Sequence, residues 1–220
     1  MSPRGRPVDP EKQVEQKENL LDAAKALLGE KGYRAITIRE IGERAAVNSA
    51  MIRYYFENKE GLFIALFDRM ATIHFKHIAD LSEQKNPLFS VIKGLLQLLN
   101  ENAGVARLIH DEIFQSDSVL RDAFIERFPK RMANFLPKLI QAQLKIDDPL
   151  KAKYVAFNLI SMLVMPFVGA PVRQLAWEIS DREISTDEWA VHIYQLFTQG
   201  ANSLSTINLQ GNEPKAEEKL

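Results

Sequence analysis

The chain of 220 residues contains no cysteine, which excludes disulfide bonds and thiolate metal sites and fits a reducing compartment. Glycine and proline are few, with ten of each, so the composition favours neither a β-rich nor a low-complexity chain. The net charge of −1 does not by itself suggest a nucleic-acid partner. With 46% hydrophobic and 26% charged residues, the composition is typical of a globular protein rather than a disordered one.

Long hydrophobic runs are scarce as well. Residues 154–172 approach the ~20 residues that span a bilayer, but Asn158, Ser161, Pro166 and Gly169 interrupt them. The first twenty residues are too polar for a signal peptide. We therefore expect a cytoplasmic protein with no membrane span, in which this run is a core helix or an oligomer-interface helix.

Residues 37–59 are the most informative segment that is present. Thr37 and Glu40 form a Thr-x-x-Glu capping box, which predicts the start of a helix. Residues 46–48 break the helical spacing, and Asn48 is a suitable cap for a second helix through Tyr54. The buried face of the first helix is predicted to contain Ile38, Ile41 and Ala45. Two short helices with a tight turn indicate a helix-turn-helix, whose second helix enters the major groove of DNA.

This segment resembles the DNA-binding segment of the TetR family of transcriptional regulators. That family has a long first helix, then Thr-x-x-x-Ile-Ala-x-x-Ala-Gly-Val, then a short recognition helix ending in Tyr-x-His/Tyr-Phe-x-x-Lys-x-x-Leu. The chain departs from this pattern at Ala46, where the family has glycine, and at Arg53, where it often has tyrosine. The resemblance covers roughly residues 12–66, and the matching residues are Thr37, Ile41, Gly42, Ala45, Val47, Tyr55, Phe56, Lys59 and Leu62.

The resemblance implies an all-α fold. It has an N-terminal three-helix helix-turn-helix DNA-binding domain and a C-terminal helical domain for ligand binding and dimerisation. The expected parts are a flexible basic arm at 1–10, the DNA-binding domain at 11–58, the helical domain at 59–204 and a polar tail at 205–220. The rest of the sequence agrees, because helical spacing and helix caps recur along it and no strand pattern appears.

The short recognition helix limits which side chains can read bases. Seven residues span only about 10 Å, so three or four side chains can reach base edges. Ser49, Ala50 and Arg53 take outward positions, and Arg53 can bind guanine O6 and N7 through two hydrogen bonds. Met51 or the methyl group of Ala50 can contact a thymine methyl group.

Phosphate contacts follow from local charge and from the resemblance. Residues 31–59 hold six lysines and arginines against three glutamates, a local basic surface on a near-neutral chain. The resemblance implies that Thr37, Tyr55 and Lys59 contact the DNA backbone. Considered without the motif, Lys59 would be interpreted as an ordinary solvated lysine. The segment Arg4-Gly5-Arg6-Pro7 resembles a minor-groove AT-hook and is equally compatible with a solvated tail. The predicted DNA contacts are Arg4, Arg6, Thr37, Arg39, Asn48, Ser49, Ala50, Met51, Arg53, Tyr54, Tyr55 and Lys59.

One short helix gives little specificity, so we expect a homodimer on a near-palindromic double-stranded DNA operator. The resemblance implies that two late helices, about 149–170 and 186–202, pair with their mates in a four-helix interface. The apolar character of residues 154–168 independently predicts that another helix covers this segment. On this hypothesis a charge at Leu159 or Leu163 produces monomers or aggregates.

The resemblance also implies a pocket among the middle helices for a small apolar ligand of unknown identity. Aromatic and methionine side chains are plentiful there, although helical stripes of this kind are more often core than pocket. The predicted lining residues are Phe89, His110, Phe114, Phe128, Met132, Phe135, Phe157 and Met162.

No metal site, cofactor or catalytic site is expected. Residues 110–112 are His-Asp-Glu, but consecutive helix positions point in different directions and cannot converge on one ion. His74 and His77 share a helix face without a third ligand. No Ser/His/Asp set or glycine-rich phosphate loop stands out.

Three functions remain open at this point. The first is a dimeric, ligand-responsive DNA-binding regulator, with a repressor as the usual form, and the second is a chromosome-organising protein of the same fold without an inducer. The third is a helical small-molecule binder or enzyme whose helix-turn-helix is incidental. Binding at a few promoters distinguishes the first from the second, and salt-dependent DNA binding eliminates the third.

Overall fold

The computed structural model describes residues 10–113 and 118–203. The α-helices within these ranges are α1 (Pro10–Glu30), α2 (Ile38–Ala45), α3 (Ala50–Phe56), α4 (Lys59–Ser82), α5 (Pro87–Glu101), α6 (Ala103–Leu108), α7 (Val119–Arg127), α8 (Pro129–Leu144), α9 (Pro149–Val168), α10 (Ala170–Ala176) and α11 (Asp187–Ser203). Two 3₁₀ turns, Tyr33–Ala35 and Glu183–Ser185, and a π-helical turn, Ile109–Ile113, lie between them. Neither range contains a β-strand, so the predicted all-α fold is confirmed.

Local sequence signals set most helix starts. The Asn86 side chain accepts a hydrogen bond from the Phe89 amide, and Pro87 fills the first position of α5. At α9 the Asp148 carboxylate accepts the amide of Leu150 at 2.8 Å. Pro129 begins α8, whereas Pro137 lies inside that helix without ending it. Caps act within one turn of the chain, which is why the sequence locates them.

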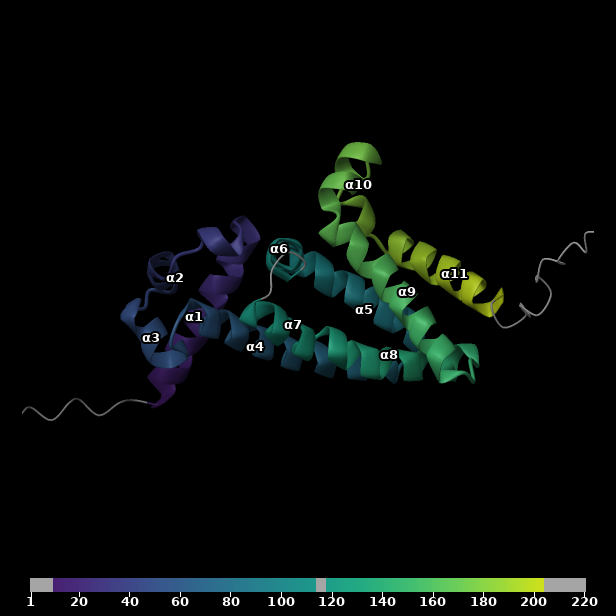
Figure 1. Ribbon diagram of the computed structural model, residues 1–220, viewed down its shortest axis with the longest axis horizontal. Helices are drawn as coiled ribbons and strands as arrows, with labels where there is room; N and C mark the ends of the chain where they lie inside the picture. Colours follow the sequence, from purple (N-terminus) through teal and green to yellow (C-terminus); the bar gives the residue numbers. More distant parts are fainter. Residues whose placement is uncertain (1–9, 114–117, 204–220) are drawn as a thin grey trace, which may run out of the picture.

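The helices form two packed parts joined by α4. In Figure 1, α1, α2 and α3 gather at one end, and α4 runs from them along α7, below α5, α9 and α11. The buried side of α4 is apolar from Leu62 to Ile78 and packs against α1, α5 and α7. This helix therefore connects the N-terminal helices mechanically to the rest of the molecule.

Further contacts fasten α1 and the loop after it to the C-terminal part. Gly104 in α6 lies so close to α1 that a Cβ atom there would be 2.4 Å from the Leu28 carbonyl oxygen. Arg34 forms an ion pair with Glu112, with Nε 2.7 Å from Oε1. The Arg34 side chain is 75% exposed and that of Glu112 only 8%, so the carboxylate belongs to the interior and the guanidinium covers it.

Helix α9 differs from the prediction in the face it presents. Leu159 and Leu163 are completely buried inside the chain, so the expectation that they form an intermolecular surface is wrong. The exposed apolar side chains of α9 are Leu150, Tyr154, Phe157 and Met165. By length and composition α9 is the one helix of the described ranges that could cross a membrane, a test that core helices of soluble proteins also pass.

His74 on α4 predicts a pH dependence of stability. Burial, together with Lys25 and His77, lowers the pKa of His74 from 6.5 to about 4, and its Nε2 atom is buried without a partner. Between these values the unfolded chain binds more protons, so stability should fall as the pH drops from about 6.5 to about 4.

Urea unfolding of the His74→Phe variant at pH 7 and pH 5 tests this, with the exposed His192→Gln as control. The difference between the two pH values should shrink in the first variant and persist in the second. An unchanged difference in His74→Phe contradicts the assignment.

Candidate nucleic-acid interface

The start of α2 is fixed by reciprocal hydrogen bonds. The Thr37 hydroxyl accepts the Glu40 amide at 3.2 Å, and Glu40 Oε2 accepts the Thr37 amide at 2.9 Å, which confirms the predicted capping box. Lys31 also reaches Glu40, and the Lys31 and Thr37 hydrogen bonds together lower the pKa of the Glu40 carboxyl group to about 2. Thr37 is therefore held at the exposed N-terminus of α2, where amide groups favour anions.

The turn between α2 and α3 is packed directly against α2. The Val47 amide donates to the Gly42 carbonyl at 3.0 Å, and a Cβ atom at Gly42 would lie 2.9 Å from the Val47 oxygen. Ala46 adopts a left-handed conformation with φ of 52°. A glycine is thus needed beside the turn at 42, while the left-handed position itself carries an alanine.

Ala46→Gly is expected to raise the free energy of unfolding by up to about 1 kcal/mol. The left-handed conformation costs a residue with a Cβ atom ~1–2 kcal/mol, and the greater chain entropy of glycine offsets part of the gain. Ala26→Gly is the matched control, because Ala26 is exposed within α1 and should lose about 1 kcal/mol. Urea unfolding measures both, and a loss of stability in Ala46→Gly contradicts the expectation.

Helix α3 begins two residues later than predicted, at Ala50. The Asn48 side chain accepts the Ala50 amide at 2.9 Å, so Asn48 still holds the start of the helix through its side chain, while Ser49 directly precedes the helix. Ile52 is completely buried, whereas Ile38 is 46% exposed and does not belong to the predicted buried face of α2. Ser49 and Met51 are half-buried.

Arg53 on α3 has a positive charge that no other group of the described ranges neutralises. Within the described ranges its exposed side chain makes no hydrogen bond or ion pair. The other arginines and Lys31 between residues 31 and 59 are paired with carboxylates, as Lys31–Glu40, Arg34–Glu112, Arg39–Glu43 and Arg44–Glu30. The count of six cations in the sequence therefore overstates the free positive charge, and Arg53 stands out. The Arg39 side chain is 84% exposed, so its ion pair with Glu43 is weak. Breaking that pair to bind a DNA phosphate instead therefore costs little free energy.

Lys59 points toward the protein in this structure. Its ammonium group donates to the carbonyl oxygens of Tyr33 and Ile36, both at 2.9 Å, and lies 4.0 Å from the centre of the Tyr33 ring. Burial lowers the pKa of Lys59 and raises that of the Tyr33 phenol to about 12. Lys59 thus joins the start of α4 to the turn before α2, and its contact with phosphate stays a prediction.

Tyr55 is oriented by α1, a contribution that the sequence analysis missed. The Tyr55 hydroxyl donates to Gln16 Oε1 at 2.8 Å, and the Lys17 ammonium lies 5.3 Å from the centre of the Tyr55 ring. The exposed ring of Tyr54 lies edge-on to Tyr55, with centroids 5.1 Å apart. No spacing rule connects residues 16 and 55, so only the folded chain reveals this contact. Arg4 and Arg6 lie outside the described residues.

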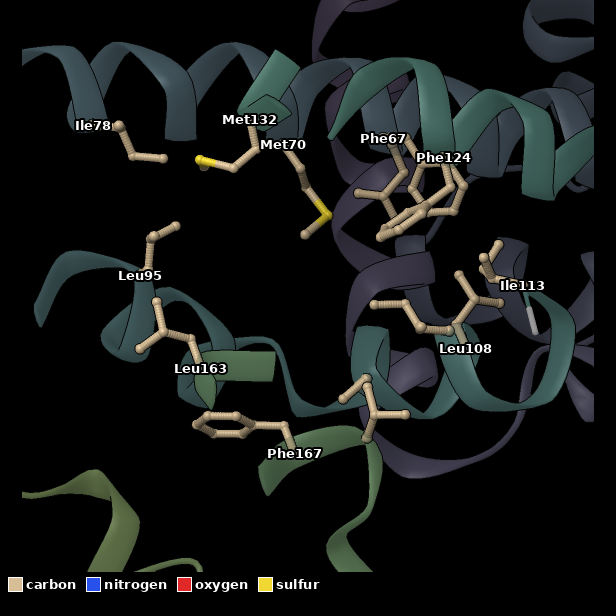
Figure 2. Close-up of a cluster of buried hydrophobic side chains, with 14 of the residues drawn as sticks. Phe67, Met70, Ile78, Leu95, Leu108, Ile113, Phe124, Met132, Leu163 and Phe167 are labelled. Carbon is tan, nitrogen blue, oxygen red and sulfur yellow. The ribbon is translucent and has the colours of Figure 1, made fainter. Parts of the chain in front are cut away.

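The residues predicted to line a pocket do not converge on one site. Met132 belongs to the main core, where side chains of α4, α7 and α8 face those of α5, α6 and α9 (Figure 2), and the half-buried Phe128 packs against that core. Phe89 packs on Tyr194, with ring centroids 5.4 Å apart, while Phe135 and Met162 are half-buried.

Two of these predictions need correction, and one cannot be placed. Phe157 is 71% exposed on the outer side of α9, which is incompatible with an internal pocket. His110 is also exposed, and its ring nitrogen lies 2.8 Å from Asp111. Phe114 lies outside the described residues.

Comparisons with known proteins agree with this geometry. Residues 20–66 match the family model of bacterial regulatory proteins of the tetR family. The chain is 50% identical over 52 residues to the uncharacterized HTH-type transcriptional regulator YvkB of Bacillus subtilis, covering 24% of this chain and 28% of that protein. It is 31% identical over 111 residues to the fatty acid metabolism regulator protein of the same organism, covering 49% of this chain and 57% of that protein. The aligned segments thus span less than two thirds of either relative.

A solved structure extends the likeness beyond the N-terminal segment. The transcriptional regulator FadR of Bacillus subtilis, in complex with stearoyl-CoA, superposes with a TM-score of 0.67 at 22% identity. The superposition covers 83% of this chain and 98% of that one. At this identity the match establishes a shared fold, with the C-terminal helices included.

Proposed function

We propose that the chain is a transcriptional regulator of the TetR family and not an enzyme, and that it acts as a ligand-responsive repressor in the cytoplasm. It binds a near-palindromic operator as a homodimer and is released by a small apolar ligand. Residues 11–58 act as the DNA-binding domain, and 59–204 act in ligand binding and dimerisation. The observation that carries the proposal is Arg53, the exposed and unpaired cation on α3 within the described ranges.

Exposed apolar residues of α9 and α11 support the homodimer. Leu150, Tyr154, Phe157 and Met165 follow one another at helical spacing along one side of α9. Leu196 on α11 is 56% exposed. We call these five residues the α9–α11 surface. A two-fold axis lets the same surface of each copy cover the other.

The apolar interior of the C-terminal part suggests the class of ligand. Phenylalanine, methionine and leucine side chains fill the space between α4, α5, α7, α8 and α9, and the only buried charged residues of the described ranges are Glu112 and Arg173. One relative is a fatty acid metabolism regulator, and one similar structure holds stearoyl-CoA. We infer that the ligand carries a long acyl chain.

Selection of bound duplexes from a random DNA pool tests operator binding. A near-palindromic consensus is expected, with affinity that falls steeply as salt rises because phosphate contacts release counterions. Binding without sequence preference supports the chromosome-organising alternative, and absence of binding at low salt overturns the proposal.

A second experiment tests the ligand class on the selected operator. Stearoyl-CoA should dissociate the complex, whereas coenzyme A alone should not. A typical coupling of ~1–3 kcal/mol corresponds to a loss of about 5- to 150-fold in operator affinity. Equal effects of the two compounds refute the acyl assignment and leave operator binding intact.

A further inference from the structure

Helix α10 is short but exposes several large apolar side chains. Its seven residues follow Gly169 at the end of α9, and in Figure 1 they project beyond the body of the molecule. Val172 is 64% exposed, Leu175 85% and Trp177, directly after the helix, 73%. Leucine and tryptophan side chains in this state cost free energy in water, since each leaves apolar area unburied. Val172 and Leu175, three residues apart, share one side of the helix, and Trp177 adds a further exposed apolar side chain directly after it. Exposed apolar patches of more than single residues mark interaction sites.

A buried arginine holds α10 in a fixed orientation. Arg173 Nε donates to the Pro166 carbonyl at 2.8 Å, and its two Nη groups bond to the Ile179 carbonyl and to the Asp181 carboxylate. Gln174 donates to the same carboxylate at 3.0 Å. Arg173 is one of the few buried charged residues in the described ranges. The helix is therefore fastened to both α9 and the following loop, and its apolar side chains are presented rigidly.

The chemistry of this surface selects its partner. From Val164 to Trp177 the only charged residue is Arg173, which is buried and neutralised by Asp181. Nucleic acids, acidic peptides and anionic lipid surfaces are recognised by exposed lysine and arginine, which this stretch lacks. An uncharged apolar surface fits a second apolar surface.

We propose that α10 docks on a second copy of this chain, with Leu175 and Trp177 as its main contacts. The inference rests on the proposed homodimer. It adds a second region to the α9–α11 surface, because α10 follows the exposed stripe of α9 directly and continues its uncharged character past Met165. A two-fold dimer contains this contact twice, once for the α10 of each copy, so a small helix contributes doubly to the interface. Tryptophan is also the side chain most enriched among residues that dominate binding energy.

Fluorescence of Trp177 gives a direct test on the full chain. The sequence contains two tryptophans, so Trp189→Phe leaves Trp177 as the sole emitter. Dilution through the dimerisation range, followed by sedimentation, should move its emission to longer wavelength and increase quenching by acrylamide. A Trp177 that is equally accessible in monomer and dimer overturns the proposal.

Substitutions separate this proposal from the dimer itself. Leu175→Glu should weaken dimerisation at least about tenfold in sedimentation, with an unchanged circular dichroism spectrum because the side chain is exposed. Asn19→Glu, which adds the same charge on exposed α1, should not. If Phe157→Glu dissociates the dimer and Leu175→Glu does not, α10 is no contact and the dimer stands. If the unaltered chain is monomeric, both proposals fail.

Discussion

Replacement of Arg53 by alanine is expected to lower operator affinity about 30-fold or more. A guanidinium that binds guanine through two hydrogen bonds contributes ~1–3 kcal/mol of discrimination, and the dimer loses this contact in both subunits. Arg53 is suited to the role because its side chain is exposed on α3 and no protein group of the described ranges occupies it. Titration of the selected operator by fluorescence anisotropy measures the loss.

Two further variants distinguish base reading from charge. Arg53→Lys keeps the charge but loses the planar fork, so it should preserve the salt dependence and relax the preference at one base pair per half-site. Arg182→Ala removes the same charge from an exposed loop position far along the chain and should leave affinity unchanged. If Arg53→Lys binds every operator variant as the unaltered chain does, Arg53 contacts phosphate rather than bases.

Glutamate at two neighbouring positions of α9 should have opposite consequences. Leu159→Glu places a carboxylate at a completely buried position and removes a core leucine. Loss of a buried leucine alone costs ~2–5 kcal/mol, and burial of an unpaired charge adds to it. Since a domain of this size is stable by only ~5–15 kcal/mol, this variant should fail to fold.

Phe157→Glu should instead give a folded monomer. The side chain is 71% exposed, so the helical spectrum and the unfolding transition measured at high dilution should persist. Sedimentation should show loss of the dimer, and operator affinity should fall because one short helix remains per binding unit. A Phe157→Glu protein that stays dimeric and binds its operator rules out the α9–α11 surface.

The sequence predicted what depends on neighbouring residues. The Thr37–Glu40 capping box occurs as expected, and the caps formed by Asn86 and Asp148 likewise involve residues within one helical turn. Asn48 shows the limit, since its hydrogen bond with Ala50 fits either a cap or a turn.

Features that depend on distant residues escaped prediction. The Arg34–Glu112 pair joins positions 78 apart, so counting charges locally could not reveal that Arg34 is occupied. An apolar helix such as α9 has little periodic contrast between its sides, and sequence alone does not say whether Leu159 or Phe157 faces the core. Orientation there is decided by what packs on each side.

The contact of Gly104 with α1 has a mechanical consequence for signalling. Side chains absorb small shifts by changing rotamers. Here, however, the backbone of α6 packs directly on the backbone of α1, and a Cβ atom at Gly104 would lie 2.4 Å from the Leu28 carbonyl oxygen. Displacement of α6 toward α1 therefore cannot be damped and must push the end of α1 with it. Under the proposed function, we expect this contact to transmit a ligand-induced shift of the C-terminal helices to the N-terminal helices proposed to bind DNA.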